Sequence, residues 1–217
     1  FGTDNQIPFT NSGGTDYDYS ADLTFDGTDL NLGISNGMAF GGTRMFYAST
    51  TNDSIAIGEG AGLNFTSGTI RNVAIGYFAG ENASTSNADS NNYIGYFAGR
   101  ENTGQLNNIL GSQAGINNTG SNNSLLGASA GFGNSGDENF IFGTQAGYAN
   151  DGSYNFIAGY RAAYSNSGSY NIAIGSEAGR LGSVNDNYNV FIGNQAARNA
   201  QSSSTVALGA WALFGAG

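Results

Sequence analysis

The segment Asn72-Val73-Ala74-Ile75-Gly76-Tyr77-Phe78-Ala79-Gly80 reveals how the whole chain is organised, because its pattern returns as Asn171-Ile172-Ala173-Ile174-Gly175-Ser176-Glu177-Ala178-Gly179. We call the first glycine of each copy the anchor. Ten copies are found, with anchors at Gly58, Gly76, Gly95, Gly111, Gly127, Gly143, Gly159, Gly175, Gly193 and Gly209. The anchors are 16 to 19 residues apart, and an alanine stands three residues after every one. A fixed short period indicates a repeat architecture in which successive units stack on one another.

The composition of the chain excludes several classes of protein. The 217 residues include 36 glycines, but these do not fall at every third position, so a collagen helix is excluded. Regularly placed branched and aromatic residues distinguish the chain from disordered ones. Cysteine and histidine are absent, which removes Ser-His triads, Cys-His dyads and ordinary zinc sites. The net charge of −10 disfavours binding to nucleic acid, and no apolar run is long enough for direct membrane insertion.

The three residues before each anchor are predicted to form a short β-strand. The residues one and two before the anchor are apolar or aromatic in all ten copies, and neighbouring strand residues point to opposite faces. Both faces of the strand therefore need cover. One face can pack inside the coil, and we expect the other to pack against identical chains in a homotrimer, since soluble monomers do not expose such a long apolar stripe. The predicted seam between chains is the column two before the anchor: Ala74, Tyr93, Ile109, Leu125, Ile141, Ile157, Ala173 and Phe191.

Three other features of the repeat predict how each coil closes. The invariant alanine is expected to lie in a second, shorter strand. Segments of the form Asn-x-Gly are expected to be turns in which glycine supplies a positive φ, at 102–104, 118–120, 134–136, 150–152 and 166–168. The asparagines four residues before the anchor are expected to bond neighbouring coils as a ladder: Asn72, Asn91, Asn107, Asn123, Asn139, Asn155, Asn171 and Asn189. The sequence thus predicts an all-β fold, a parallel β-roll or β-solenoid of about ten coils.

Residues 1–51 do not carry the repeat and are predicted to form a small N-terminal β cap or connector ahead of the repeat array at 52–217. The segments 23–25 and 30–32 flank Asp26-Gly27, which is typical of a hairpin turn, and 38–40 and 45–47 indicate a second pair of strands. Five acidic residues in this region are open to three interpretations, as solvated turn residues, a calcium site or a glycosidase-like carboxylate pair: Asp16, Asp18, Asp22, Asp26 and Asp29. Their spacing matches no calcium loop or catalytic motif, so we expect no cofactor, no metal and no enzymatic activity.

The sequences Asn-Val-Ala-Ile-Gly at 72–76 and Asn-Ile-Ala-Ile-Gly at 171–175 resemble the head repeats of trimeric autotransporter adhesins. Phage tail fibres carry similar repeats with Gly-x-x-Ala-Gly segments like 76–80, and the lead-in at 7–11 and 23–28 resembles that of such fibres. The repeat resemblance covers about three quarters of the chain. It implies a left-handed, homotrimeric β-roll in an extracellular fibre, on a phage virion or on a bacterial cell surface. Many such fibres end in a chaperone that cleaves itself off, which is not visible in this sequence.

Aromatic pairs directly after two successive anchors are the best candidates for receptor binding. Tyr77-Phe78 and Tyr96-Phe97 place the same two residue types at the same height, and aromatic rings suit the apolar faces of sugars. Further tyrosines follow at 148, 154, 160, 164 and 170, and all these rings have packing within or between chains as the other interpretation. We therefore expect a fibre segment that attaches to a neutral surface glycan or another cell-surface receptor. The alternatives are a purely structural fibre subunit and a tailspike-like glycan hydrolase.

Overall fold

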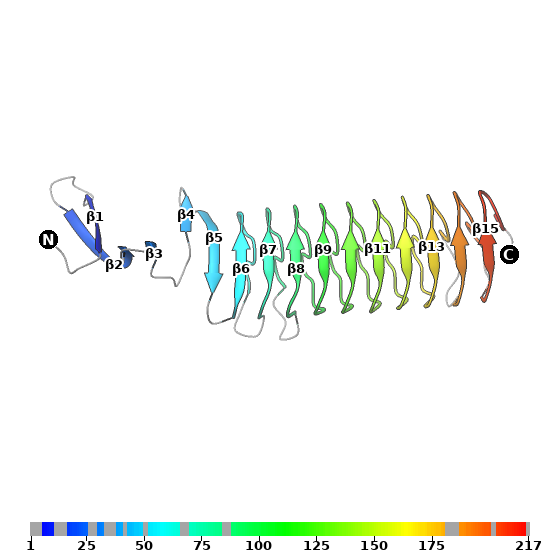
Figure 1. Ribbon diagram of the computed structural model, residues 1–217, viewed down its shortest axis with the longest axis horizontal. Coiled ribbons are helices and arrows are strands. Elements are labelled where there is room, and N and C mark those ends of the chain that lie inside the picture. The colour runs from blue at the N-terminus through cyan, green and yellow to red at the C-terminus, as the bar shows by residue number, and fades with distance from the viewer. Residues whose placement is uncertain are drawn as a thin grey trace.

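The computed structural model (Figure 1) describes residues 6–10, 17–25, 30–32, 38–40, 43–49, 52–65, 70–83, 88–180, 187–200 and 203–215. The regular secondary structure within these residues consists of β-strands, and most of the strands belong to one long sheet. The strands lie side by side along the long axis of the array, each one coil further on (Figure 1). The chain is thus an all-β protein whose repeat array is a parallel β-solenoid, as the sequence predicted.

Ten short strands form the parallel part of the sheet, and each immediately precedes one anchor glycine. They are β6 (Ser54–Ile57), β7 (Val73–Ile75), β8 (Asn92–Ile94), β9 (Asn108–Leu110), β10 (Ser124–Leu126), β11 (Phe140–Phe142), β12 (Phe156–Ala158), β13 (Ile172–Ile174), β14 (Val190–Ile192) and β15 (Val206–Leu208). Equivalent residues pair in register, so Ile109 lies beside Leu125, which lies beside Ile141. In-register pairing places each position of the repeat in one straight column along the solenoid.

The N-terminal strands pair antiparallel, as the sequence predicted for both hairpins. Strands β1 (Gln6–Thr10), β2 (Tyr17–Phe25) and β3 (Leu30–Leu32) form a separate three-stranded sheet. Strand β4 (Met38–Phe40) pairs with β5 (Thr43–Ser49), and β5 pairs antiparallel with β6. Strands β4 and β5 therefore extend the solenoid sheet across the boundary expected near residue 51. The Asp26-Gly27 turn lies outside the described residues.

Each anchor glycine brings the backbone of its coil very close to that of the next coil. Gly95, for example, has a φ of 134°, and a Cβ atom added to it would lie 2.6 Å from the carbonyl oxygen of Gly111. The same approach of backbone to backbone is found at each anchor from Gly58 to Gly193. A larger residue would be strained by this φ and would collide with the neighbouring coil, which explains the glycine at each anchor from Gly58 to Gly193, whereas at Gly209 only the positive φ applies.

The residue two before each anchor points into the coil, so the predicted seam between chains is wrong. Its eight members are only 0–8% exposed in the single chain: Ala74, Tyr93, Ile109, Leu125, Ile141, Ile157, Ala173 and Phe191. They form one core cluster with the invariant alanines. The residues one and three before the anchor point outward instead, and Phe140 and Phe142 are both exposed. Because both strand faces are apolar, the sequence did not fix the register, and a shift of one residue exchanges inside and outside.

Tyr93 is the one member of this interior column that carries a polar group, and that group has a partner. Its hydroxyl accepts a hydrogen bond of 2.9 Å from Asn102 Nδ2. Burial raises the pKa of Tyr93 far above its ordinary value, so the phenol stays neutral in the folded chain. The hydrogen bond removes the cost of an unsatisfied polar atom in the core.

The segment after each anchor is a run of turns and not the second strand that the sequence predicted. In one central coil Gln113, Gly115 and Asn117 have φ values of 59°, 57° and 56°, and they alternate with residues of negative φ. Alternating left-handed residues cannot continue an extended strand. The turns still bond from coil to coil, since the Gln113 N–H donates to the Tyr96 carbonyl and the Gly115 N–H to the Ala130 carbonyl, at 2.7 and 2.9 Å.

A buried asparagine ladder joins successive coils, as the sequence predicted. Asn107 Oδ1 accepts a 2.8 Å hydrogen bond from the Asn123 N–H, and Asn107 Nδ2 donates to the Gly120 carbonyl at 3.0 Å. The first of these bonds recurs at each step along Asn72, Asn91, Asn107, Asn123, Asn139, Asn155, Asn171 and Asn189. From Asn72 to Asn155, each side chain therefore bonds both the next asparagine of the ladder and a backbone carbonyl of the next coil.

A second ladder runs through the Asn-x-Gly turns, and the reason why these turns need glycine differs from the prediction. Asn118 Nδ2 donates to Asn102 Oδ1 in the preceding coil and to the Gly120 carbonyl in its own turn, both at 2.7 Å. Gly120 does not have the positive φ that the turn pattern predicted. Glycine is required here because a Cβ atom would collide with the carbonyl oxygen of Gly136 in the next coil. Close stacking, and not turn geometry, therefore selects glycine at this position.

Gly127→Ala tests the close approach of the coils. A Cβ atom at Gly127 would lie 2.8 Å from the Gly143 carbonyl group, whereas at Gly133, which also has positive φ, it would meet nothing within 4 Å. We expect Gly133→Ala to cost about 1 kcal/mol from left-handed strain alone, and Gly127→Ala to cost about 3 kcal/mol or more. Urea unfolding followed by circular dichroism measures both. Equal losses in the two variants would contradict the role assigned to the anchor.

Candidate functional site

The predicted receptor-binding residues Tyr77, Phe78, Tyr96 and Phe97 form one aromatic cluster on the turn after the anchor. The rings of Tyr77 and Tyr96 stack with centroids 5.5 Å apart and planes 7° from parallel. The rings of Phe78 and Phe97 have centroids 5.7 Å apart, and each packs edge-on against the tyrosine of its own coil. The tyrosines are 42% and 48% exposed, while the phenylalanines are half-buried. The four rings therefore form a small aromatic platform whose tyrosines reach the solvent.

The turn conformation and a polar rim define this platform. Phe78 and Phe97 have φ values of 50° and 53°, which is the left-handed conformation that recurs two residues after the anchors. Arg100 lies over the Phe97 ring, with its Cζ 5.2 Å from the ring centroid, and it is held by ion pairs with Glu81 and Glu101 at 3.1 and 3.4 Å. An apolar ring surface with charged groups at its edge can contact the apolar face of a sugar and bond its hydroxyls.

Two further aromatic columns run along the solenoid, and four of their tyrosines, at 148, 154, 164 and 170, were expected from the sequence as binding or packing residues. Phe132, Tyr148 and Tyr164 stand five residues after their anchors, with consecutive centroids 4.9 Å apart. Tyr154, Tyr170 and Tyr188 stand five residues before theirs, with consecutive centroids 4.9 and 5.1 Å apart. The constant offset from the anchor was the signal that could have revealed both columns.

The exposed tyrosine column ends beside a polar hollow. A shallow depression of about 470 Å³ is lined by Asn122, Ser124, Glu138, Asn139 and Phe140. The negative charge of Glu138 raises the pKa of Tyr154, and a hydrogen bond between the two side chains acts in the same direction. None of the residues predicted to bind a receptor lies in this hollow.

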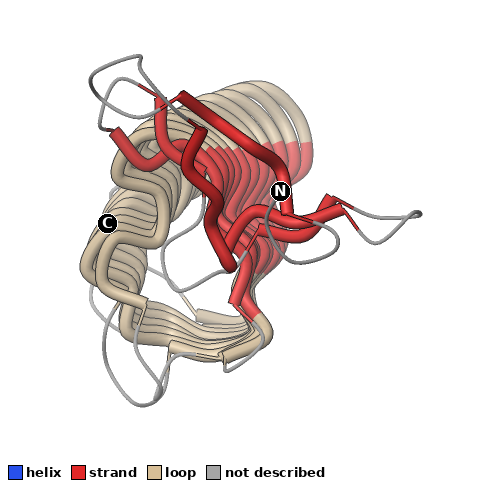
Figure 2. Tube along the Cα trace, turned by 90° about the vertical axis from the view of Figure 1, so that its left-hand side faces the viewer, coloured by secondary structure: helices blue, strands red, loops and turns tan. Residues whose placement is uncertain are grey.

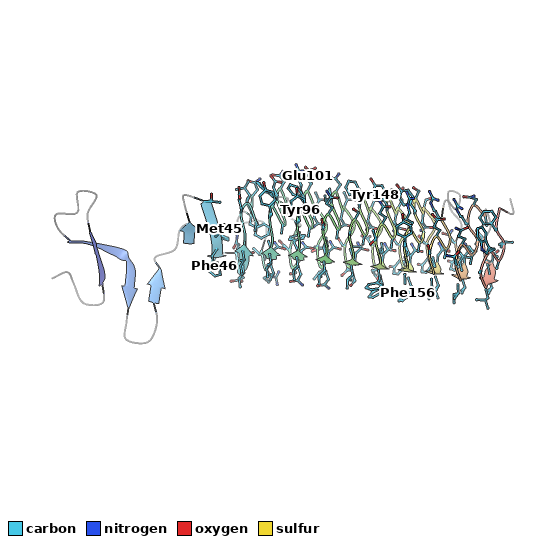
Figure 3. All side chains as sticks on the ribbon, turned by 90° about the horizontal axis from the view of Figure 1, so that it is seen from above. Met45, Phe46, Tyr96, Glu101, Tyr148 and Phe156 are labelled. Carbon is cyan, nitrogen blue, oxygen red and sulfur yellow. The ribbon has the colours of Figure 1, made fainter. Side chains whose placement is uncertain are left out.

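The outer face of the parallel sheet carries an apolar column along all ten coils. Its column one residue before the anchor is apolar throughout: Ile57, Ile75, Ile94, Leu110, Leu126, Phe142, Ala158, Ile174, Ile192 and Leu208. The column three before the anchor includes Phe140 and Phe156, which stack with centroids 5.1 Å apart, and is polar at Asn92, Asn108 and Ser124. Figure 3 shows Phe46 and Phe156 on one side of the solenoid and Tyr96 and Tyr148 on the other. The sheet face and the aromatic platform thus lie on opposite sides.

The end-on view in Figure 2 shows that the strands occupy one side of each coil and the turns make up the rest. Within the described ranges, no group of three or more acidic side chains is placed to hold a metal ion. This result does not test the calcium site considered from the sequence. The described ranges do not include Asp16, Asp26 and Asp29, nor the side chains of Asp18 and Asp22. The same part of the chain contains no helix that could cross a membrane.

The chain matches no protein-family model, no curated protein and no solved structure. Its function therefore has to be argued from the solenoid and its surfaces alone.

Proposed function

We propose that this chain is a rigid segment of an extracellular fibre that attaches to a surface glycan or another cell-surface receptor. Identical chains associate through the outer face of the parallel sheet into a homotrimer, and the aromatic platforms on the opposite side remain available for attachment. The proposal places the fibre on a phage virion or on a bacterial cell surface and assigns the chain no catalysis. The observation that carries it is the continuous apolar column on the outer sheet face, directly before all ten anchors.

The dimensions of the sheet face support association. Ten strands spaced about 4.8 Å apart give a face about 45 Å long, and three residues make it about 10 Å wide. An apolar patch of several hundred Å² on a soluble protein is usually a functional contact surface. Because the columns are straight and run the length of the array, copies arranged around an axis parallel to the solenoid bring the same residues together in every coil. The number three comes from the resemblance of the repeats to adhesin heads and tail fibres.

The aromatic platform supports attachment. Each chain of a trimer presents one platform formed by Tyr77, Phe78, Tyr96 and Phe97, so one fibre carries three equivalent sites. Weak binding at each site becomes strong attachment when several sites engage together. Exposed aromatic rings suit neutral sugars, whose apolar faces stack on them.

A purely structural fibre subunit is the second candidate, and one observation favours it. The platform rings already pack on one another, with the Tyr77 and Tyr96 planes nearly parallel. This packing is by itself a sufficient reason for aromatic residues at these positions. In that case the receptor site belongs to another chain or domain.

Phe142→Asp tests association through the sheet face. Phe142 is 55% exposed in the single chain, and in the proposed trimer three copies are brought together away from water. Burying an unpaired carboxylate costs several kcal/mol, so we expect the variant to be a folded monomer at micromolar concentration in sedimentation velocity. Tyr188→Asp, which introduces the same charge in an exposed tyrosine column, should remain trimeric. A monomeric parent, or a trimeric Phe142→Asp variant, would show that the face is not the interface.

Tyr96→Ala combined with Phe97→Ala tests attachment. We expect the double variant to remain a trimer and to lose most of its multivalent attachment to neutral glycans on a glycan array or to cells. Tyr154→Ala combined with Tyr170→Ala removes two rings from another column and should keep attachment. If the first variant attaches as well as the parent, the platform is a packing feature and the structural candidate is favoured. If it unfolds, the rings belong to the core and supply no receptor site.

A further inference from the structure

The charge of the chain is divided very unevenly along the solenoid. Residues 1–151 contain 14 acidic residues and three arginines, a net charge of −11, while residues 152–217 contain two acidic residues and three arginines, a net charge of +1. The three arginines of the second part are Arg161, Arg180 and Arg198. They come from three successive coils and follow the anchor by two or five residues. A local basic site therefore exists on a protein whose overall charge repels anions.

The side chains of these arginines are joined through Tyr164 and Glu177. The Cζ atoms of Arg161 and Arg180 lie 5.0 and 5.8 Å from the centroid of the Tyr164 ring. Glu177 bridges the other pair, with Oε1 3.2 Å from Arg180 Nη1 and Oε2 3.3 Å from Arg198 Nε. Two guanidinium groups thus share the Glu177 carboxylate, and Arg161 has no carboxylate partner among the described residues, so the three arginines and Glu177 keep an excess of two positive charges. Within the described part of the chain, Arg161 has cation–π contacts but no ion pair.

Several polar atoms in this group are buried without a hydrogen-bond partner. The donors without a partner include the Nε atoms of Arg161 and Arg180, and the acceptor without a partner is the Oε1 atom of Gln195. Gln195 stands two residues after its anchor, in the same column as Arg161 and Glu177. A buried polar atom without a partner costs free energy. A ligand that brings both an anionic group and hydroxyl groups would supply partners for both kinds of atom.

Tyr160 and Tyr164 add a ring surface to the basic group. Tyr160 is 51% exposed, and the Arg161 guanidinium lies 5.9 Å from its ring centroid. The group lies along the column that contains Tyr148, on the side of the solenoid away from Phe156 and the sheet face (Figure 3). Tyr160 is exposed and the arginines are partly exposed in a single chain, and they would stay so if the sheet face associates.

We propose that Arg161, Arg180, Tyr160, Tyr164 and Gln195 form a binding site for an acidic saccharide. A carboxylate or sulfate group on the sugar accepts hydrogen bonds from the two guanidinium groups, which present paired donors in a planar fork. The sugar ring lies against the exposed Tyr160, and a hydroxyl group of the adjoining sugar unit donates to Gln195 Oε1, which lies two coils further on. This site differs from the aromatic platform in its coils and in its ligand, since the platform is proposed to bind neutral sugars.

Isothermal titration of the full chain with glucuronic acid, glucose and sodium sulfate tests the site. We expect glucuronic acid to bind in the millimolar range, to bind less tightly as salt is added, and to lose about tenfold in affinity in Arg161→Gln. Glucose, which has the same ring without the carboxylate, should not bind at this site. Arg71→Gln removes the same charge from an exposed position elsewhere and should leave the affinity unchanged.

Three results would overturn the proposal. The site would not exist if glucuronic acid failed to bind at tens of millimolar. It would be a general anion site, and not a saccharide site, if sulfate bound as tightly as glucuronic acid. The location would be wrong if Arg71→Gln weakened binding as much as Arg161→Gln. Each of these outcomes is independent of trimer formation and of the Tyr96 and Phe97 variants.

Discussion

The close stacking of one coil on the next is the constraint on which the rest of the structure depends. At the anchors the backbones approach so closely that only glycine fits, and at Gly104, Gly120, Gly136 and Gly152 the next coil again leaves no room for a Cβ atom. Two asparagine ladders hold the coils in this position, because amides such as Asn107 bond the next coil and amides such as Asn118 bond the adjacent coil as well as their own turn. A coil that lost its register would break both ladders and its strand pairing together. Each coil therefore needs the same residue types at the same positions, which explains the regular period of the sequence.

Stacking of this kind also separates the surfaces of the protein. Within the described coils, the interior is filled by one column of strand residues, the invariant alanines and the two asparagine ladders, and the aromatic rings and arginines lie on the outside. The outer sheet face carries a continuous apolar column one residue before the anchors, whereas the turns on the opposite side carry aromatic rings and arginines. Under the proposed function, the first surface assembles the fibre and the second meets the receptor. Because they lie on opposite sides, the same residues are not needed for both tasks.

The sequence predicted the period, the parallel solenoid, both N-terminal hairpins and the asparagine ladder, because these depend on residue types at fixed spacing. The predicted seam placed the wrong strand face between chains, because Ile141 and Phe142 are both apolar and only packing against the alanine column distinguishes them. The prediction of a second strand was wrong because residues such as Gln113 and Arg161 have positive φ, which the sequence of side chains does not indicate. The aromatic platform was predicted from two repeated pairs, whereas the arginine group depends on three coils and became visible only in the stacked structure.

The most direct test of the account combines register with association. The chain contains no cysteine, so Ile141→Cys and Phe142→Cys each introduce a single thiol that reports its own surroundings. After mild oxidation, the account predicts covalent dimers on a denaturing gel for Phe142→Cys, because that thiol meets its equivalents across the sheet face. It predicts only monomers for Ile141→Cys, whose thiol lies inside the coil. Cross-linking of Ile141→Cys in the absence of cross-linking of Phe142→Cys would contradict both the register and the proposed interface.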